Sequence, residues 1–208
     1  MIKIKICGVQ SEEVAKAVAS CGAHFIGIVF HASSKRFVDL PQAKKIAQST
    51  KKHGGTPVAI FVDHTAEEMH DICVATNITT IQLHGYNARQ QHHLLPAYYQ
   101  RLYAQPVSEN GEIPDIENGL LYCNPLRDYC LLDNPKAGAG QPFTWNKINY
   151  TGPFRLGVAG GLTPYNVALA IQTLRPALVD VSSGVENIGE KNIVLIKQFI
   201  TEVNCASL

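Results

Sequence analysis

Hydrophobic and polar residues follow a strand-then-helix pattern that starts at the first residues and recurs along the chain. In residues 2–7, isoleucine alternates with Lys3, Lys5 and Cys7, and a period of two with β-branched residues is typical of a β-strand. Residues 25–30 form an almost unbroken apolar run, as expected for a parallel strand that is covered on both faces. The chain therefore predicts a first strand ending at Cys7 and a buried second strand.

Six further segments carry strand signals, and helical signals fall between most of them. The further strands are predicted at residues 57–62, 79–83, 101–104, 129–133, 155–159 and 177–181, with 101–104 the weakest. Helices are predicted from Ser11, around Pro41, over 87–95, near Trp145 and over 193–203. A capping box at Thr65 and Glu68 predicts another helix start. Thr163-Pro164 predicts a further one, whose helix carries Val167, Ala168, Ile171 and Leu174 on one face. Glycine and proline interrupt residues 105–127, so the fifth helix is expected to be short or missing.

Eight strands, each followed by a helix or its remnant, predict an α/β protein with a closed (β/α)₈ barrel. The 208 residues give 26 per unit, and no break in composition divides the chain, so residues 1–208 are expected to form a single catalytic domain at the small end of the range for this fold. The alternative is a doubly wound open sheet. A GxGxxG motif after the first strand would favour that sheet, and residues 8–11 lack it.

Composition and charge bear on whether the protein binds nucleic acid, a membrane or a metal ion. The net charge of +1 gives no sign of a nucleic-acid-binding surface. No apolar h-region or long apolar window is found, so we expect neither a signal peptide nor a membrane span. The six cysteines lack CxxC and zinc-finger spacing, which favours free thiols in a reducing cytoplasm. His92 and His93 are adjacent and point about 100° apart on a helix, so no metal site is expected.

Polar residues at the predicted strand ends are the candidates for chemistry, because α/β barrels place their active sites there. Cys7 is either a base or nucleophile, or a small buried hydrophobe. Asp133 follows two leucines, which suits a general acid of raised pKa, although a helix cap or an ion-pair partner fits as well. Arg36 is either a carboxylate clamp or a solvated loop residue. His84 is interpreted as a capping or packing group rather than a metal ligand.

Two consecutive loops rich in small residues predict a phosphate site. Gly160 and Gly161 follow the seventh strand, and Ser183 and Gly184 follow the eighth. Glycine lets backbone N–H groups approach an anion, and serine adds a hydroxyl donor, although turn chemistry explains each loop alone. Asp180 is expected to point into the barrel if the valines on either side of it point outward.

The ordered set of motifs resembles the phosphoribosylanthranilate isomerase family over nearly the whole chain. The motifs are Lys5-Ile6-Cys7-Gly8, Ser34-Lys35-Arg36, Gln82-Leu83-His84-Gly85, Leu131-Leu132-Asp133, Ala159-Gly160-Gly161-Leu162 and Asp180-Val181-Ser182-Ser183-Gly184-Val185-Glu186. The resemblance implies a cofactor-free (β/α)₈ barrel of tryptophan biosynthesis that performs an Amadori rearrangement of a phosphoribosyl anthranilate. It also implies a small phosphosugar substrate, a cytoplasmic location, and a monomer or homodimer.

The resemblance assigns a role to each matching residue. Asp133 would protonate the ring oxygen of the sugar, and Cys7 would remove the C2′ proton. Arg36 would hold the anthranilate carboxylate, and Asp180 would contact sugar hydroxyls. The phosphate would be held by Gly160, Gly161, Ser183 and Gly184.

The chain departs from the family pattern in three places. Ala137 and Ala139 stand in a loop that usually reads Gly-Gly-Thr-Gly, Thr144 stands for an aspartate, and Asn192 stands for an aspartate before the last helix. Two other functions stay open at this stage. The first is another phosphosugar isomerase or epimerase, although the histidine-pathway enzyme has an aspartate where this chain has Cys7. The second is a phosphosugar-binding protein without catalysis.

Overall fold

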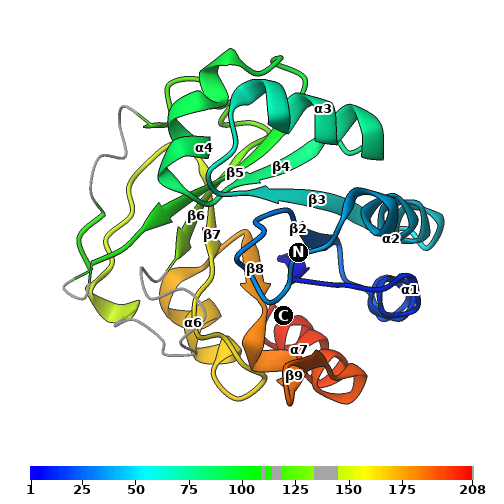
Figure 1. Ribbon diagram of the computed structural model, residues 1–208. Coiled ribbons are helices and arrows are strands. Elements are labelled where there is room, and N and C mark those ends of the chain that lie inside the picture. The colour runs from blue at the N-terminus through cyan, green and yellow to red at the C-terminus, as the bar shows by residue number, and fades with distance from the viewer. Residues whose placement is uncertain (109–110, 114–118, 134–144, 208) are drawn as a thin grey trace.

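The computed structural model describes residues 1–108, 111–113, 119–133 and 145–207, and its eight parallel strands close into a barrel in chain order (Figure 1). The strands are β1 (Lys3–Cys7), β2 (Phe25–Val29), β3 (Thr56–Phe61), β4 (Thr80–Leu83), β5 (Gln100–Pro106), β6 (Tyr129–Asp133), β7 (Arg155–Val158) and β8 (Leu178–Val181). Pairing of β1 with β8 closes the barrel and sets Lys5 opposite Asp180. The predicted (β/α)₈ fold is therefore confirmed.

Helices surround the strands on the outside of the barrel (Figure 1). The α-helices are α1 (Glu12–Ser20), α2 (Leu40–Lys52), α3 (Ala66–Thr76), α4 (Tyr86–Gln91), α6 (Val167–Leu174) and α7 (Ile193–Ala206), and the short 3₁₀ helices are η1 (His92–Leu94), η2 (Trp145–Lys147) and η3 (Ser183–Val185). A two-stranded hairpin, β9 (Glu186–Asn187) and β10 (Glu190–Lys191), lies between η3 and α7. The segment predicted to lack a full fifth helix lies partly outside the described residues.

Local side-chain caps explain where several helices begin. The Ser11 side chain accepts a hydrogen bond from the backbone of Val14 at the start of α1. Thr65 and Glu68 form the predicted capping box at α3. Each cap satisfies backbone donors that the first helical turn leaves without a partner. The sequence therefore determines these helix starts locally.

The apolar core has two layers. One lies inside the barrel and includes Phe25, Leu102, Tyr129, Leu131 and Leu178. The other lies between the strands and the surrounding helices. Strands with apolar side chains on both faces supply the two layers together, as expected for a parallel barrel.

The strand predicted at 101–104 is present but longer than predicted, because β5 covers Gln100–Pro106 and is the longest described strand of the barrel. Its polar Arg101 is almost fully buried, because the guanidinium donates to the carbonyls of Tyr99 and Leu95. These bonds compensate for burial of the charge.

The sixth α-helix begins at Val167 rather than at Thr163-Pro164. The Asn166 side chain accepts from the Thr163 backbone and donates to the Gly161 carbonyl, which holds the preceding residues in a turn. The buried face of α6 consists of Val167, Ala170 and Ile171, so the predicted place of Ala168 on that face is also wrong.

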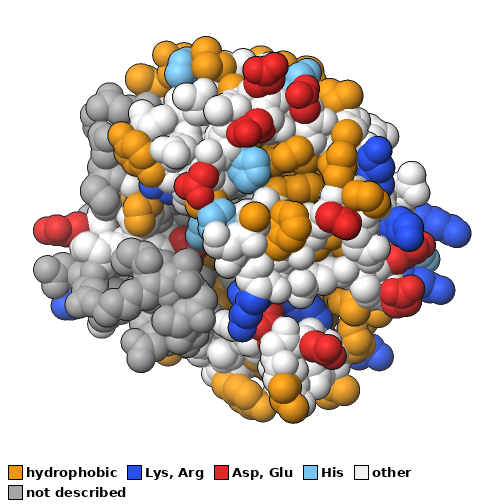
Figure 2. Space-filling model, in the orientation of Figure 1, with side chains coloured by type: hydrophobic (Ala, Val, Ile, Leu, Met, Phe, Trp, Pro, Cys, Tyr) orange, Lys and Arg blue, Asp and Glu red, His pale blue; other side chains and the backbone are white. Residues whose placement is uncertain are grey.

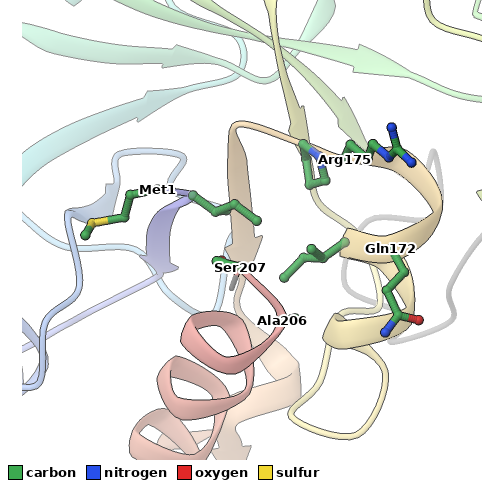
Figure 3. A pocket seen from close by; sticks show the side chains of 8 residues that line it. Met1, Gln172, Arg175, Ala206 and Ser207 are labelled. Carbon is green, nitrogen blue, oxygen red and sulfur yellow. The ribbon is translucent and has the colours of Figure 1, made fainter.

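The end of the barrel where the strands begin carries a pocket of about 440 Å³. Figure 3 shows Met1 on one side, Gln172 and Arg175 on the other, and Ala206 and Ser207 at the end of the last helix between them. Met1 and Ser207 therefore line the same pocket at this end, which is opposite to the ends of the strands where the candidate residues are found.

The surface has no dominant charge on the face shown in Figure 2, where acidic and basic side chains both occur. No helix among the described residues is long and apolar enough to cross a membrane.

Candidate active site

The carboxyl ends of the strands bring all the sequence-predicted site residues to one end of the barrel. Cys7 ends β1 and Asp133 ends β6, while Asp180 lies within β8 one residue before its end. Arg36 lies in the loop after β2, and the two glycine-containing loops follow β7 and β8. This is the end at which barrels of this type place their chemistry.

Lys5, Cys7 and Asp180 form a charged cluster inside this end of the barrel. The Lys5 side chain is fully buried, and its Nζ lies 2.7 Å from Asp180 Oδ2. Burial alone would lower the pKa of Lys5, but the interactions with Asp180 and Cys7 together outweigh burial, so the pKa is raised. Lys5 is therefore a cation next to Cys7 at neutral pH, and Asp180 points into the barrel as predicted.

The pKa of the Cys7 thiol is raised, not lowered as expected for a base in the free protein. Burial is the largest cause, and the positive charges of Lys5 and Lys191 offset it only in part. Asp180 also raises the pKa, because a carboxylate disfavours a nearby thiolate. The thiol is therefore protonated at neutral pH as long as the charged groups around it keep this arrangement.

The Arg36 guanidinium is bound by a carboxylate of the chain itself. Its Nε and Nη2 donate to the two oxygens of Glu186 at 2.6 and 2.7 Å. Gly8 has a φ of +76°, and a Cβ there would collide with Arg36 Cδ, so Arg36 runs directly over the turn that follows β1. The structure thus brings Arg36 next to the end of the first strand.

Lys191 links Glu186 to the backbone of the first strand. Its Nζ lies 2.6 Å from Glu186 Oε1 and 3.0 Å from the Ser182 carbonyl oxygen. The Ser182 hydroxyl donates to the Cys7 carbonyl oxygen at 3.1 Å. A continuous set of polar contacts therefore connects Arg36 with the strand end that carries Cys7.

Glu186 has a pKa lowered to about 2. Burial acts in the opposite direction, but hydrogen bonds from Arg36 and Lys191 and their charges outweigh it. Glu186 is therefore a carboxylate at neutral pH.

Asp133 lies beside His84. The His84 Nδ1 is 3.4 Å from Asp133 Oδ2, and the side chain of Asp133 is 13% exposed. The Gln82 amide nitrogen lies 3.4 Å from the same His84 nitrogen. His84 therefore lies in polar contact with both Gln82 of β4 and the acid candidate, and its interpretation as a capping or packing group stays a prediction.

The loops after β7 and β8 lie against each other. A Cβ at Gly184 would overlap the carbonyl oxygen of Leu162, so only glycine permits this approach. Gly160 and Gly161 both adopt positive φ, at 80° and 72°. The four residues predicted to bind phosphate therefore belong to two loops in direct contact.

Sequence reasoning missed the roles of Glu186 and Lys191. It named Lys5 as a group that could stabilise the Cys7 thiolate, but it missed the pairing of Lys5 with Asp180. The register that sets these two residues opposite each other belongs to the tertiary structure, and no local pattern in the sequence indicates it. The departures at Ala137, Ala139 and Thr144 lie outside the described residues. Within the described part of the chain, no group of three or more His, Cys, Asp or Glu residues is arranged to hold a metal ion.

Comparison with known proteins places these features in a family. Residues 4–202 match the family model described as N-(5′-phosphoribosyl)anthranilate (PRA) isomerase. A protein of that name from Chlamydia caviae is 38% identical over 201 residues, which cover 96% of this chain and 95% of the relative. One from Streptococcus pneumoniae is 39% identical over 210 residues, covering 98% and 96%.

Solved structures give the same result. The phosphoribosyl anthranilate isomerase from Thermotoga maritima superimposes with a TM-score of 0.85 at 33% identity, covering 99% of this chain and 100% of that one. A solved structure of a phosphoribosyl anthranilate isomerase in complex with reduced 1-(o-carboxyphenylamino)-1-deoxyribulose 5-phosphate gives a TM-score of 0.75 at 30% identity, covering 99% of this chain and 100% of that one. On the family match, the curated relatives and the shared barrel, this chain belongs to the N-(5′-phosphoribosyl)anthranilate isomerase family.

Proposed function

We propose that the protein converts N-(5′-phosphoribosyl)anthranilate to 1-(2-carboxyphenylamino)-1-deoxyribulose 5-phosphate, the isomerase step of tryptophan biosynthesis, in the cytoplasm. The observation that carries the proposal is the placement of Cys7 and Asp133 at the ends of β1 and β6, around the same barrel opening as the two contacting loops. The reduced product bound to one relative of known structure supports the choice of substrate.

Asp133 acts first, as the general acid. It donates a proton to the ring oxygen of the sugar while the anthranilate nitrogen pushes its electron pair toward C1′. The C1′–O bond breaks, and the open chain carries a protonated imine. The position of Asp133 at a strand end, largely shielded from water, suits this role.

Cys7 acts second, as the general base. Its thiolate removes the C2′ proton, and the electron pair moves into the imine to form an enolamine, which then tautomerises to the ketone. The imine nitrogen accepts the electrons, so these steps use no cofactor. The fixed positive charge of Lys5 favours the thiolate that the step requires.

The remaining residues bind the substrate. Arg36 holds the anthranilate carboxylate, and Gly160, Gly161, Ser183 and Gly184 hold the phosphate through backbone N–H groups and a hydroxyl. Asp180 contacts a sugar hydroxyl through Oδ1, which is buried and has no hydrogen-bond partner among the described residues.

The test is turnover of phosphoribosylanthranilate, followed by loss of its fluorescence, with EDTA present. Wild-type protein should be active, and Asp133→Asn and Cys7→Ala should each lower kcat by about 10²–10⁴-fold, the usual cost of losing a general acid or base. Both variants should still bind the reduced product.

Cys205→Ala is the matched control for Cys7→Ala, because Cys205 is exposed near the end of α7. This variant should retain full activity. Absence of turnover by wild-type protein at micromolar concentration would contradict the proposed function. Near-normal kcat in Asp133→Asn or Cys7→Ala would contradict that residue's role.

A further inference from the structure

Arg36 presents only part of its hydrogen-bonding capacity to a substrate. A guanidinium has five N–H donors arranged along two edges that can each bind a carboxylate. Glu186 occupies the edge formed by Nε and Nη2. Nη1 makes no hydrogen bond within the described part of the chain, so the edge formed by Nη1 and Nη2 remains for another carboxylate.

Glu186 is itself held in place from two sides. The pairing of β9 with β10 sets Lys191 opposite Glu186, and Lys191 Nζ lies 2.6 Å from Glu186 Oε1. The side chains of Glu186 and Lys191 are only 6% and 4% exposed. Glu186 is therefore a rigid platform for Arg36 rather than a mobile surface group.

The charge of this group favours an anionic ligand. Arg36 and Lys191 carry two positive charges against the single negative charge of Glu186. One positive charge is therefore left over, and the chain supplies no second carboxylate to Arg36 among the described residues. A bound anion can therefore balance this charge at the second edge of Arg36 without displacing Glu186.

From these contacts we propose that Glu186 is a positioning residue that sets the specificity for the carboxylate of the substrate. It fixes one edge of the Arg36 guanidinium so that the other edge is presented to the anthranilate carboxylate. The inference rests on the proposed function and deepens it, because it names the group that makes Arg36 selective.

The physical reason is preorganisation. Arginine loses considerable rotamer freedom when it is immobilised, and a ligand that must immobilise it binds more weakly. Because Gly8 has no side chain, the aliphatic part of Arg36 can lie directly against the turn after β1, and Glu186 fixes its charged end. Binding then requires little further ordering of the side chain.

Glu186→Gln tests the role, with two ligands that differ only in the carboxyl group. The first ligand is reduced 1-(o-carboxyphenylamino)-1-deoxyribulose 5-phosphate, and the second is the same compound made with aniline in place of anthranilate. We expect Glu186→Gln to weaken binding of the first ligand by about 10- to 100-fold, which is the range for a charge-assisted hydrogen bond. Affinity for the second ligand should change less than about threefold. Calorimetry on the two ligands measures the difference.

Kinetics provide a second readout. The carboxylate does not change during the reaction, so the interaction is equally strong in the ground and transition states. Glu186→Gln should therefore raise KM for phosphoribosylanthranilate and leave kcat within a few-fold of wild type. Glu186→Asp keeps the charge but shortens the side chain. Its KM should therefore lie between the values for wild type and for Glu186→Gln.

Glu190→Gln is the matched control, because it removes the same charge from the same hairpin. Glu190 is exposed and makes no ion pair within the described part of the chain. Both affinities and both kinetic constants should stay at wild-type values in this variant, and thermal unfolding should show that all variants are folded.

Three outcomes overturn the inference. Equal weakening of both ligands would show a merely structural role, and unchanged affinity for the carboxylate ligand would show no role. Tighter binding of that ligand would show that Glu186 competes with it for Arg36. Failure of the proposed function is distinguishable, since wild-type protein would then neither bind the reduced product nor turn over the substrate.

Discussion

At the scale of the residue, the reactivity of Cys7 depends on charges that other strands supply. Because its pKa is raised, the thiolate forms only above the pH at which an ordinary thiol ionises. In the unliganded protein, alkylation of Cys7 by iodoacetamide should therefore rise at higher pH than alkylation of free cysteine in solution, with little reaction at neutral pH. Mass spectrometry of each labelled cysteine across a pH series measures both profiles.

Bound reduced product should shield Cys7 and leave Cys205 labelling unchanged, because only Cys7 lies at the proposed site. Cys205 thus serves as a control within the same molecule. A Cys7 profile that follows that of free cysteine, or lies at lower pH, would contradict the raised pKa.

At the scale of the element, the last helix is capped by the residue that departs from the family pattern. The Asn192 Oδ1 accepts from the backbone of Val194 at 2.9 Å and of Leu195 at 3.2 Å. Asn192→Ala should lower the free energy of unfolding by about 1 kcal/mol, the usual cost of losing an N-cap. Asn192→Asp should equal or slightly exceed wild-type stability, because a carboxylate at a helix N-terminus also interacts with the helix dipole.

Urea unfolding measures both variants. Asn187→Ala is a suitable control, since Asn187 is exposed in the neighbouring hairpin and its side chain makes no hydrogen bond in the described structure. Unchanged stability of Asn192→Ala would show that the cap contributes nothing to α7.

At the scale of the whole molecule, a buried ion pair spans the two strands whose pairing closes the barrel. Lys5 lies on β1 and Asp180 on β8, and both are nearly inaccessible to solvent. Lys5→Met should lower the free energy of unfolding by about 3–5 kcal/mol, because it leaves the Asp180 charge buried without a partner. Asp180→Leu together with Lys5→Met should recover much of that loss. Urea unfolding of the single and double variants measures the energetic coupling between Lys5 and Asp180. Equal losses of unfolding free energy in Lys5→Met and in the double variant would contradict that coupling.

The sequence by itself determined the order of elements and the end of the barrel at which the candidate residues lie. Strand periodicity, the Thr65 capping box and the Ser11 cap depend on residues a few positions apart, so they can be recognised without the fold. The placement of Cys7 and Asp133 at strand ends follows from the same local signals, and both lie there in the structure. The roles of these two residues stay a prediction.

The tertiary structure alone decided which charges meet. Lys5 and Asp180 are 175 positions apart, and Arg36 and Glu186 are 150 apart, so no local pattern indicates either pair. The raised pKa of Cys7 has the same origin, because burial and the charge of Asp180 on the last strand both raise it. Burial and Coulomb interactions depend on distances in space, and closure of the barrel sets those distances by bringing the first and last strands together.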